Sequence, residues 1–336
     1  MARHFRAFLA LTAAASLGLA ACSAGDLVAQ SGDTIPQSGP TIDADRASHV
    51  LKDLESVVAS ADATNDTTLL ASRLADPALR MRKAQYALAK AGGPDVPRIN
   101  ATPDTLSVSD SATWPRAILN VTTQDGIALP VVEMLVQSDA RSPYKLHSWT
   151  RMLGGTEVTL PNVAKGSKTL SDDSNGFVKT PREAVAAYVE MLNSGKAGND
   201  VFTADEFSTK ILSDTAKVDE SAKAAGSVTF QAAENTDPLV GVTLEDGAAL
   251  VSAPLVYTVT YNRTIAKSTM TLAGMPKVLN PGDEDKVEGK AVVTFAGAVL
   301  LKIPPATQPG SISVVGAEQV IQGVTLDPST NPDNAG

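Results

Sequence analysis

Apolar residues between positions 43 and 91 recur every three or four places, which is the spacing of one face of an α-helix. The clearest stretch is marked by five such residues: Val50, Leu51, Leu54, Val57 and Val58. A second helix start is expected at Asp76-Pro77, because proline suits the first position of a helix, and Gly92-Gly93 is a plausible stop. The pattern predicts two or three helices in this segment.

The pattern changes after Pro94 to short segments that are β-branched or alternate between apolar and polar residues. Such segments, when turn residues separate them, are typical of antiparallel strands. Asp125-Gly126 and Ser142-Pro143 supply the turns. The predicted strands cover residues 117–122, 129–136 and 144–153. Residues 154–180 contain Gly154-Gly155 and are predicted to form a linker or a long loop.

A second cycle of helices and strands begins at Thr180-Pro181, where threonine can cap a helix and proline can open it. This helix is expected to end at Gly195, and another is predicted over roughly 203–223. Residues 276–285 are predicted to form a loop. The expected strands of this half cover residues 227–233, 239–245, 249–262, 288–303 and 311–324.

Helices followed by antiparallel strands, twice in succession, predict an α+β protein with two tandem domains. We place the N-terminal domain at 43–160, a linker at 161–179, the C-terminal domain at 180–326 and a disordered tail at 327–336. Each domain would pack its helices on a curved antiparallel sheet. This order of elements resembles the cone-like folds of the nuclear-transport-factor-2 and cystatin superfamilies. The halves show no clear residue-level repeat, so a duplication is a hypothesis about structure alone.

The N-terminus has the organisation of an export signal. Arg3 and Arg6 give a basic start, and residues 8–19 form an apolar run broken only by small residues. This run is shorter than the ~20 residues that a permanent membrane-spanning helix needs. A basic start, a short apolar run and a small-residue exit are typical of a cleaved signal peptide.

The exit Leu19-Ala20-Ala21-Cys22 resembles the lipobox of bacterial lipoproteins. The resemblance implies that residues 1–21 are removed by cleavage between Ala21 and Cys22, leaving a diacylglyceryl cysteine whose acyl chains are of the palmitate type. Residues 22–42, rich in Ser, Gly and Pro, would then be a flexible tether. The implied location is the outer face of the cytoplasmic membrane. The alternative is an ordinary secreted protein with a cysteine near its cleavage site.

Cys22 is the only cysteine of the 336 residues, so disulfides, cysteine metal sites and thiol catalysis are not expected. The formal net charge is −9 and becomes more negative when the signal peptide is removed. Such a chain is a poor partner for nucleic acid and for anionic lipid surfaces. The N-terminal lipid is therefore the predicted membrane contact. Aromatic residues make up only 4%, which disfavours sugar-stacking surfaces.

Three short phrases resemble a set of uncharacterised actinobacterial lipoproteins. They are Pro-Ala-Leu-Arg-Met-Arg-Lys-Ala-Gln-Tyr at 77–86, Trp-Pro-Arg at 114–116 and Ser-Pro-Tyr-Lys-Leu-His-Ser-Trp at 142–149. The resemblance would cover most of residues 43–325. In this chain His147 stands where the family pattern has a tryptophan. The resemblance implies a lineage and a cell-envelope location, and it brings no activity with it.

His147 is the best candidate for chemistry. In the predicted strand 144–153, Lys145, His147, Trp149 and Arg151 occupy alternate positions and would therefore share one face of the sheet. An imidazole, a ring and two cations on one face could bind an anionic ligand. The alternative is a solvated face on which the lysine and arginine stems cover the tryptophan. His49, in the first helix, is predicted to be a structural or surface residue.

Motifs of the common enzyme classes are missing from the sequence. There is no Gly-x-Ser-x-Gly elbow, no phosphate-binding loop of the Walker type and no His-Glu-x-x-His pair. The acidic run Asp283-Glu284-Asp285 lacks the spacing of an EF-hand calcium loop. We therefore predict no metal site and no cofactor, and we favour a protein without catalytic activity.

Our leading hypothesis is a cell-envelope lipoprotein that binds a protein, a peptide or a small ligand without catalysis. A second hypothesis is a small-molecule enzyme with a pocket inside a cone-like domain, in which His147 is the acid or base. A third is the solute-binding component of a transporter. The third is disfavoured because the chain lacks the alternating strands and helices of two parallel-sheet lobes.

Overall fold

The computed structural model describes the chain from residue 39 onward, leaving out positions 127, 234–235, 283–284 and 335–336. The predicted signal peptide, Cys22 and most of the predicted tether lie outside the described residues. The described end of that tether already belongs to the fold, since the amide of Thr41 donates to the carbonyl of Ser109 at 2.8 Å. Among the described helices, none has the length and apolar character to cross a membrane.

The helices predicted over 43–91 are confirmed as α2 (Ala44–Asp62), α3 (Thr67–Ala71) and α4 (Ala78–Lys90). Asp43 caps α2 by accepting the amide of Arg46 at 2.8 Å, which satisfies a donor that the first turn leaves free. The inward side of α2 is entirely apolar and consists of Ala47, Leu51, Leu54, Val58 and Ala61.

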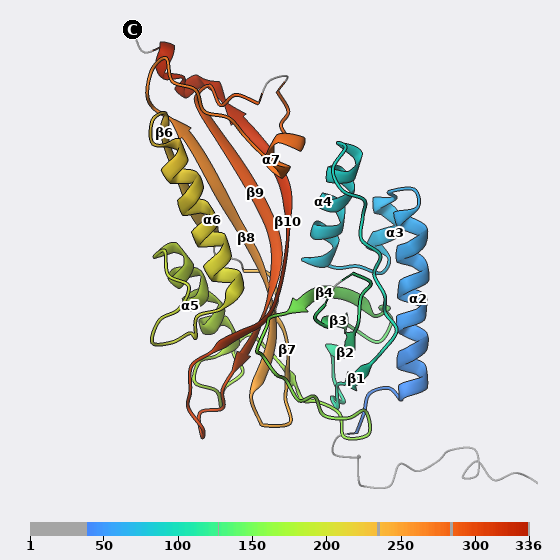
Figure 1. The fold of residues 1–336 in the computed structure, drawn as a ribbon. Coiled ribbons are helices and arrows are strands. Elements are labelled where there is room, and N and C mark those ends of the chain that lie inside the picture. The colour runs from blue at the N-terminus through green and yellow to red at the C-terminus, as the bar shows by residue number, and fades with distance from the viewer. Residues whose placement is uncertain (1–38, 127, 234–235, 283–284, 335–336) are drawn as a thin grey trace, which may run out of the picture. The chain divides into compact units, whose positions relative to one another are not determined.

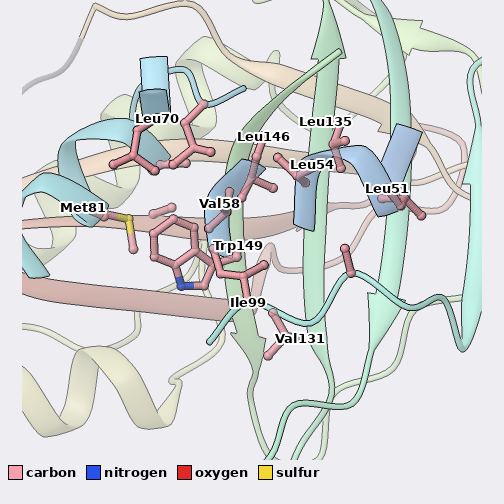
Figure 2. Packing of buried hydrophobic residues seen from close by; sticks show 14 of the residues in the cluster. Leu51, Leu54, Val58, Leu70, Met81, Ile99, Val131, Leu135, Leu146 and Trp149 are labelled. Atoms are coloured by element: carbon pink, nitrogen blue, oxygen red, sulfur yellow. The ribbon is translucent and has the colours of Figure 1, made fainter. Parts of the chain in front are cut away.

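The three strands predicted in the first half are also confirmed, and an additional short strand precedes them. Together they are β1 (Thr105–Val108), β2 (Arg116–Thr122), β3 (Val131–Gln137) and β4 (Lys145–Met152). All neighbouring pairs are antiparallel. Figure 2 shows how Leu135, Leu146 and Trp149 of these strands pack against the buried side of α2.

The second half repeats the order of helices and strands. Helices α5 (Pro181–Asn193) and α6 (Glu206–Ala222) form where they were predicted, and Thr180 and Glu183 cap α5 reciprocally. A two-residue strand, β5 (Thr169–Leu170), lies in the predicted linker, and the short helix α7 (Met275–Val278) begins at the edge of the predicted loop. The remaining strands are β6 (Gly226–Ala233), β7 (Val240–Thr243), β8 (Ala249–Arg263), β9 (Lys290–Ile303) and β10 (Ser313–Asp327).

The strands of both halves belong to one antiparallel sheet, where two sheets were expected. Its order is β1-β2-β3-β4-β10-β9-β8-β7-β5, and β6 pairs with β8. The junction is short: β10 meets β4 at the pairs Gly316–Met152 and Ala317–Arg151. A side chain at Gly316 would approach Thr150 Oγ1 to 2.9 Å, so the close contact of strands at the junction requires glycine. The α+β class is thus confirmed, whereas the division into two tandem domains stays a prediction.

The helices of the two halves cover opposite faces of the long strands β8, β9 and β10 (Figure 1). On β9, Ala296 and Ala298 pack in the core beneath α2, α3 and α4. Val299 and Leu301, which alternate with them, pack in the core beneath α5 and α6. Alternate residues of a strand point to opposite faces, so one strand serves both cores.

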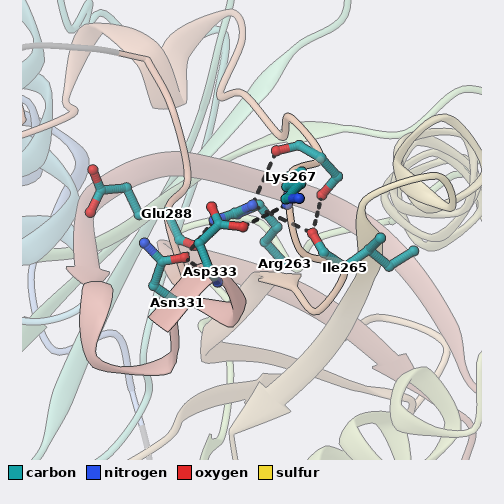
Figure 3. Close-up of polar contacts among 7 residues, drawn as sticks. Arg263, Ile265, Lys267, Glu288, Asn331 and Asp333 are labelled. Atoms are coloured by element: carbon teal, nitrogen blue, oxygen red, sulfur yellow. Dashed lines mark hydrogen bonds and ion pairs between the residues drawn. The ribbon is translucent and has the colours of Figure 1, made fainter. Parts of the chain in front are cut away.

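The end of the chain is more ordered than predicted. Strand β10 runs to Asp327, and two 3₁₀-helices follow at Pro328–Thr330 and Pro332–Asn334. Arg263, which is 4% exposed, holds them by donating to Asn331 Oδ1 at 2.6 Å and to Asp333 Oδ2 at 2.7 Å (Figure 3). The sequence analysis predicted a disordered tail over 327–336, whereas residues 327–334 are ordered in the structure. The buried guanidinium of Arg263 holds this segment in place.

Candidate functional site

The four candidate residues of β4 do not form one exposed face. Strand β3 pairs Leu135 with Leu146 and Met134 with Ser148, so His147 is an extra residue in a β-bulge. The bulge breaks the alternation on which the prediction depended. As a result, Leu146 and Trp149 both lie in the core beneath α2.

Each of the four side chains has a different environment. Trp149 is 7% exposed and packs in the core. Lys145 donates through Nζ to the carbonyl of Ala71 at 2.7 Å, and Arg151 donates to Glu206 Oε1 at 2.9 Å. Two of the candidates are therefore buried, and the two cations already bind groups of the protein.

His147 is buried in the fold and uncharged near neutral pH. Its side chain is 6% exposed, and burial lowers the pKa of the imidazole to about 4, although Asp237 and Asp76 oppose the shift. Its Nε2 has no hydrogen-bond partner. A general acid or base must reach the reacting proton of a substrate. A ring with this burial is poorly placed for that role.

A buried carboxyl group that the sequence analysis missed lies on β3. Glu133 is 0% exposed, and burial raises its pKa to about 8, so it is largely protonated at neutral pH. Asn120 Nδ2 donates to Glu133 Oε2 at 2.9 Å, while Glu133 Oε1 and Asn120 Oδ1 have no partner. The only signal in the sequence was an acidic residue inside the apolar run 131–136.

A cavity with a mostly apolar lining lies between α6 and the long strands. Helix α6 crosses the sheet face with only two of its residues fully buried, Ser208 and Ile211. The space left beneath it is about 270 Å³. Its walls come from α6, α7, β8, β9 and β10, and we call it the α6 groove. Its apolar and aromatic lining consists of Ile211, Val218, Tyr257, Val259, Tyr261, Pro276, Val293 and Phe295.

Aromatic rings form the floor of the α6 groove. Tyr257 and Phe295 stack with centroids 4.7 Å apart and planes inclined by 8°, and Phe230 packs on Tyr257 at 5.1 Å. The hydroxyl of Tyr257 donates to Gln319 Oε1. Burial raises the pKa of Tyr257, so the hydroxyl remains a donor at neutral pH. The floor is thus a rigid apolar platform with one polar end.

The rim of the α6 groove carries charge. Lys210 and Asp214 line the opening, and Lys210 Nζ lies 2.6 Å from Asp214 Oδ2. Lys217 Nζ approaches the other carboxylate oxygen at 3.4 Å. The side chains of both lysines are more than 70% exposed. Asp214 therefore binds two ammonium groups, that of Lys210, which lines the groove, and that of Lys217, which does not belong to the lining.

A larger cavity of about 480 Å³ lies at the N-terminal end of α6, between the loop after β4 and the ends of β9 and β10. Its lining includes charged and small residues, some of which bind groups of the protein outside the lining. Asp205 caps α6 by accepting the amide of Ser208 at 2.7 Å, and Lys302 pairs with Asp246 at 2.7 Å. Because ligand sites are mostly apolar and this lining holds several charged residues, we favour the smaller apolar groove as the ligand site.

Nothing in the described part of the chain points to a bound metal. Among those residues, no group of three or more His, Cys, Asp or Glu side chains is close enough to hold a metal ion.

Sequence reasoning located the elements of the α6 groove but not the groove itself. It predicted helix 203–223 and long strands at 249–262 and 288–303, which carry most of the lining. How tightly a helix packs on a sheet has no local motif. An indirect signal exists: the buried positions of α6 include Ser208, whereas those of α2 are all alanine, leucine or valine, so the inward side of α6 is less apolar.

Comparison with known proteins adds no assignment. No family model matches the chain, and neither a curated protein nor a solved structure is significantly similar to it.

Proposed function

We propose that this protein is a lipid-anchored lipoprotein of the cell envelope that binds a small apolar ligand in the α6 groove, without catalysis. The anchor part rests on the short apolar run at 8–19 and on the lipobox-like Leu19-Ala20-Ala21-Cys22. Two acyl chains on Cys22 would hold the chain at the outer face of the cytoplasmic membrane without a spanning helix. The short phrases at 77–86 and 142–149 support an actinobacterial lineage.

The α6 groove is the observation that carries the binding proposal. Ligand sites are concave and mostly apolar, with a few polar groups that orient the ligand, and they span roughly 300–1,000 Å³. The α6 groove, at about 270 Å³, is close to the lower end of that range. Its floor is the stacked pair Tyr257–Phe295, and its polar groups are confined to Gln319, Thr215 and the rim. These properties favour a small, elongated apolar ligand.

We further propose that the two halves, 43–160 and 180–326, are cone-like domains that share one sheet. Two observations support this. Each half has its own helices and its own hydrophobic core. In the second half, a helix lies across long antiparallel strands with a groove between them. In a cone-like domain this is where a ligand is expected.

Ligand binding can be measured on the full chain carrying Cys22→Ser, which prevents lipidation and allows work without detergent. The probe is N-phenyl-1-naphthylamine, a neutral apolar dye whose fluorescence rises in apolar surroundings. We expect saturable binding of one dye molecule per chain. Thr215 lies on the groove side of α6 and is half-buried, so Thr215→Trp should fill the groove and abolish binding.

Thr209→Trp is the matched control, because Thr209 is exposed on the same helix and should tolerate the identical change. Circular dichroism of both variants checks that they fold. The proposal is wrong if the dye does not bind saturably, or if folded Thr215→Trp binds it as well as Thr209→Trp does.

The anchor is tested separately in a bacterial host with a palmitate analogue that carries an alkyne. The unmodified chain should be labelled and should fractionate with the membrane, while Cys22→Ser should be unlabelled. Labelling of the serine variant would exclude Cys22 as the lipidation site.

A further inference from the structure

The rim of the α6 groove indicates which apolar molecules would bind, and this inference rests on the proposed binding function. Lys210, which lines the groove, and Lys217, two turns further along α6 and outside the lining, both bind Asp214, so this group of three side chains carries one more positive than negative charge. This contrasts with the chain as a whole, whose net charge is −9. A local positive edge on an acidic protein attracts a negative group specifically.

The α6 groove is elongated. Its lining on α6 runs from Lys210 to Val218, which at 1.5 Å per residue is about 12 Å along the helix axis. On β8 the lining residues are Tyr257, Val259 and Tyr261, three successive positions of one strand face. A cavity of about 270 Å³ with this length suits one linear hydrocarbon chain better than a fused-ring molecule.

The apolar surface continues to the opening near α7. Pro276 lines the groove, and the preceding Met275 is 44% exposed, one of the few large apolar side chains with such exposure in the described residues. Methionine adapts its shape to flexible apolar partners. A chain that enters the groove therefore meets apolar contacts at the opening as well as on the floor.

We propose that the α6 groove binds a single-chain amphiphile with one negative charge, of the fatty-acid type. The hydrocarbon lies on the Tyr257–Phe295 platform, and the carboxylate lies by the ammonium groups of Lys210 and Lys217 that bind Asp214. Asp214 then changes from the sole partner of the two lysines to one of two anions that they bind.

The hydrocarbon part is tested with linear carboxylates of six, eight, ten and twelve carbons, bound to the Cys22→Ser chain and followed by calorimetry. Each methylene group that becomes buried should tighten binding about fourfold. The increase should end once the chain is longer than the groove. Affinity that does not depend on chain length would overturn the proposal.

The head group is tested with three ten-carbon probes: decanoate, decanol and decyltrimethylammonium. At low salt we expect decanoate to bind about two- to fivefold tighter than the cation, an effect of the size of an exposed ion pair. The preference should weaken in high salt because mobile ions screen exposed charges. It should also weaken in the double variant Lys210→Gln, Lys217→Gln.

Lys223→Gln is the matched control, since Lys223 follows the end of α6 and pairs with Glu220. It should keep the preference for decanoate. If the three probes bind equally, the head-group inference is wrong while the apolar groove stands. If none binds to the parent chain, the proposed function is wrong as well.

Discussion

Helices α2 and α6 each cover one face of the sheet, on opposite sides, yet they pack very differently. Helix α2 buries five residues of 19, all alanine, leucine or valine. Helix α6 buries two residues of 17, and one of them is Ser208. Buried apolar area is the main source of stability, at roughly 25 cal/mol per Å². The N-terminal layer is therefore built for stability, whereas α6 leaves apolar strand surface open to another molecule.

The largest effect should come from breaking a buried charge pair in the N-terminal layer. Arg82 of α4 is 1% exposed, and it donates through Nε to Asp62 Oδ1 at 2.9 Å. Asp62→Ala leaves this buried guanidinium without a carboxylate and with only Gln85 Oε1 to accept from it, which should lower the free energy of unfolding by roughly 3–5 kcal/mol. Urea denaturation measures the loss.

Asp214→Ala on α6 is the corresponding control. Its carboxylate also binds cations, but the side chain is about half exposed. A surface ion pair contributes about 0–1 kcal/mol to stability, so this change should hardly alter the free energy of unfolding. Equal losses at the two positions would contradict the difference between the layers.

A matched pair of leucines compares the packing directly. Leu54 of α2 is 0% exposed, whereas Leu212 of α6 is half-buried. Leu54→Ala should lower the free energy of unfolding by roughly 2–5 kcal/mol because it leaves a cavity in a closed core. Leu212→Ala should cost about 1 kcal/mol. Should thermal unfolding rank the two variants in the opposite order, α6 would be the better-packed helix.

The buried carboxyl of Glu133 should make stability depend on pH. Its pKa rises from 4.5 to about 8 on folding, so between these values the folded chain holds a proton that the unfolded chain has lost. Stability should therefore fall as pH rises through this window, by up to about 1.4 kcal/mol per pH unit. His147, whose pKa is lowered, acts below pH 6.5, so denaturation from pH 6.5 to 8 avoids its contribution.

Glu133→Gln removes the titrating group and keeps an amide of similar shape beside Asn120. This variant should show a flatter stability profile over the same pH range. A profile unchanged from that of the parent chain would show that another group carries the pH dependence.

The smallest effect is a difference in backbone protection. Amides of α6 should exchange with solvent faster than those of α2, because local opening costs less where few apolar contacts are lost. Hydrogen exchange followed by mass spectrometry measures both helices in one experiment. Decanoate should slow exchange in α6 and leave α2 unchanged. Faster exchange in α2 than in α6 would reverse the comparison.

Much of the secondary structure followed from local pattern, for physical reasons. Helix α2 was predictable because Leu51, Leu54 and Val58 must share one face for the core to form. Thr180 and Pro181 marked the start of α5 equally well, because threonine can cap a helix and proline suits its first position. The long strands β8 and β9 were predictable from their β-branched runs.

The candidate site was harder to predict because it depends on non-local geometry. The assumed face of Lys145, His147, Trp149 and Arg151 required strict alternation, and the bulge at His147 removed it. A bulge has no clear signature in a single strand. The α6 groove depends on how far a helix stands from strands that begin 27 or more residues after the helix ends.

The junction between β4 and β10 has a consequence for how the chain folds. Strand β4 ends at Met152, while β10 begins only at Ser313, and the two pair at Gly316 and Ala317. During synthesis, which starts at the N-terminus, one edge of β4 remains unpaired until the whole second half has been made. Such non-local pairing slows folding, and an open edge invites association with other chains. Premature termination before Ser313 would leave both β4 and β9 with exposed edges, turning an unfinished product into a nucleus for aggregation.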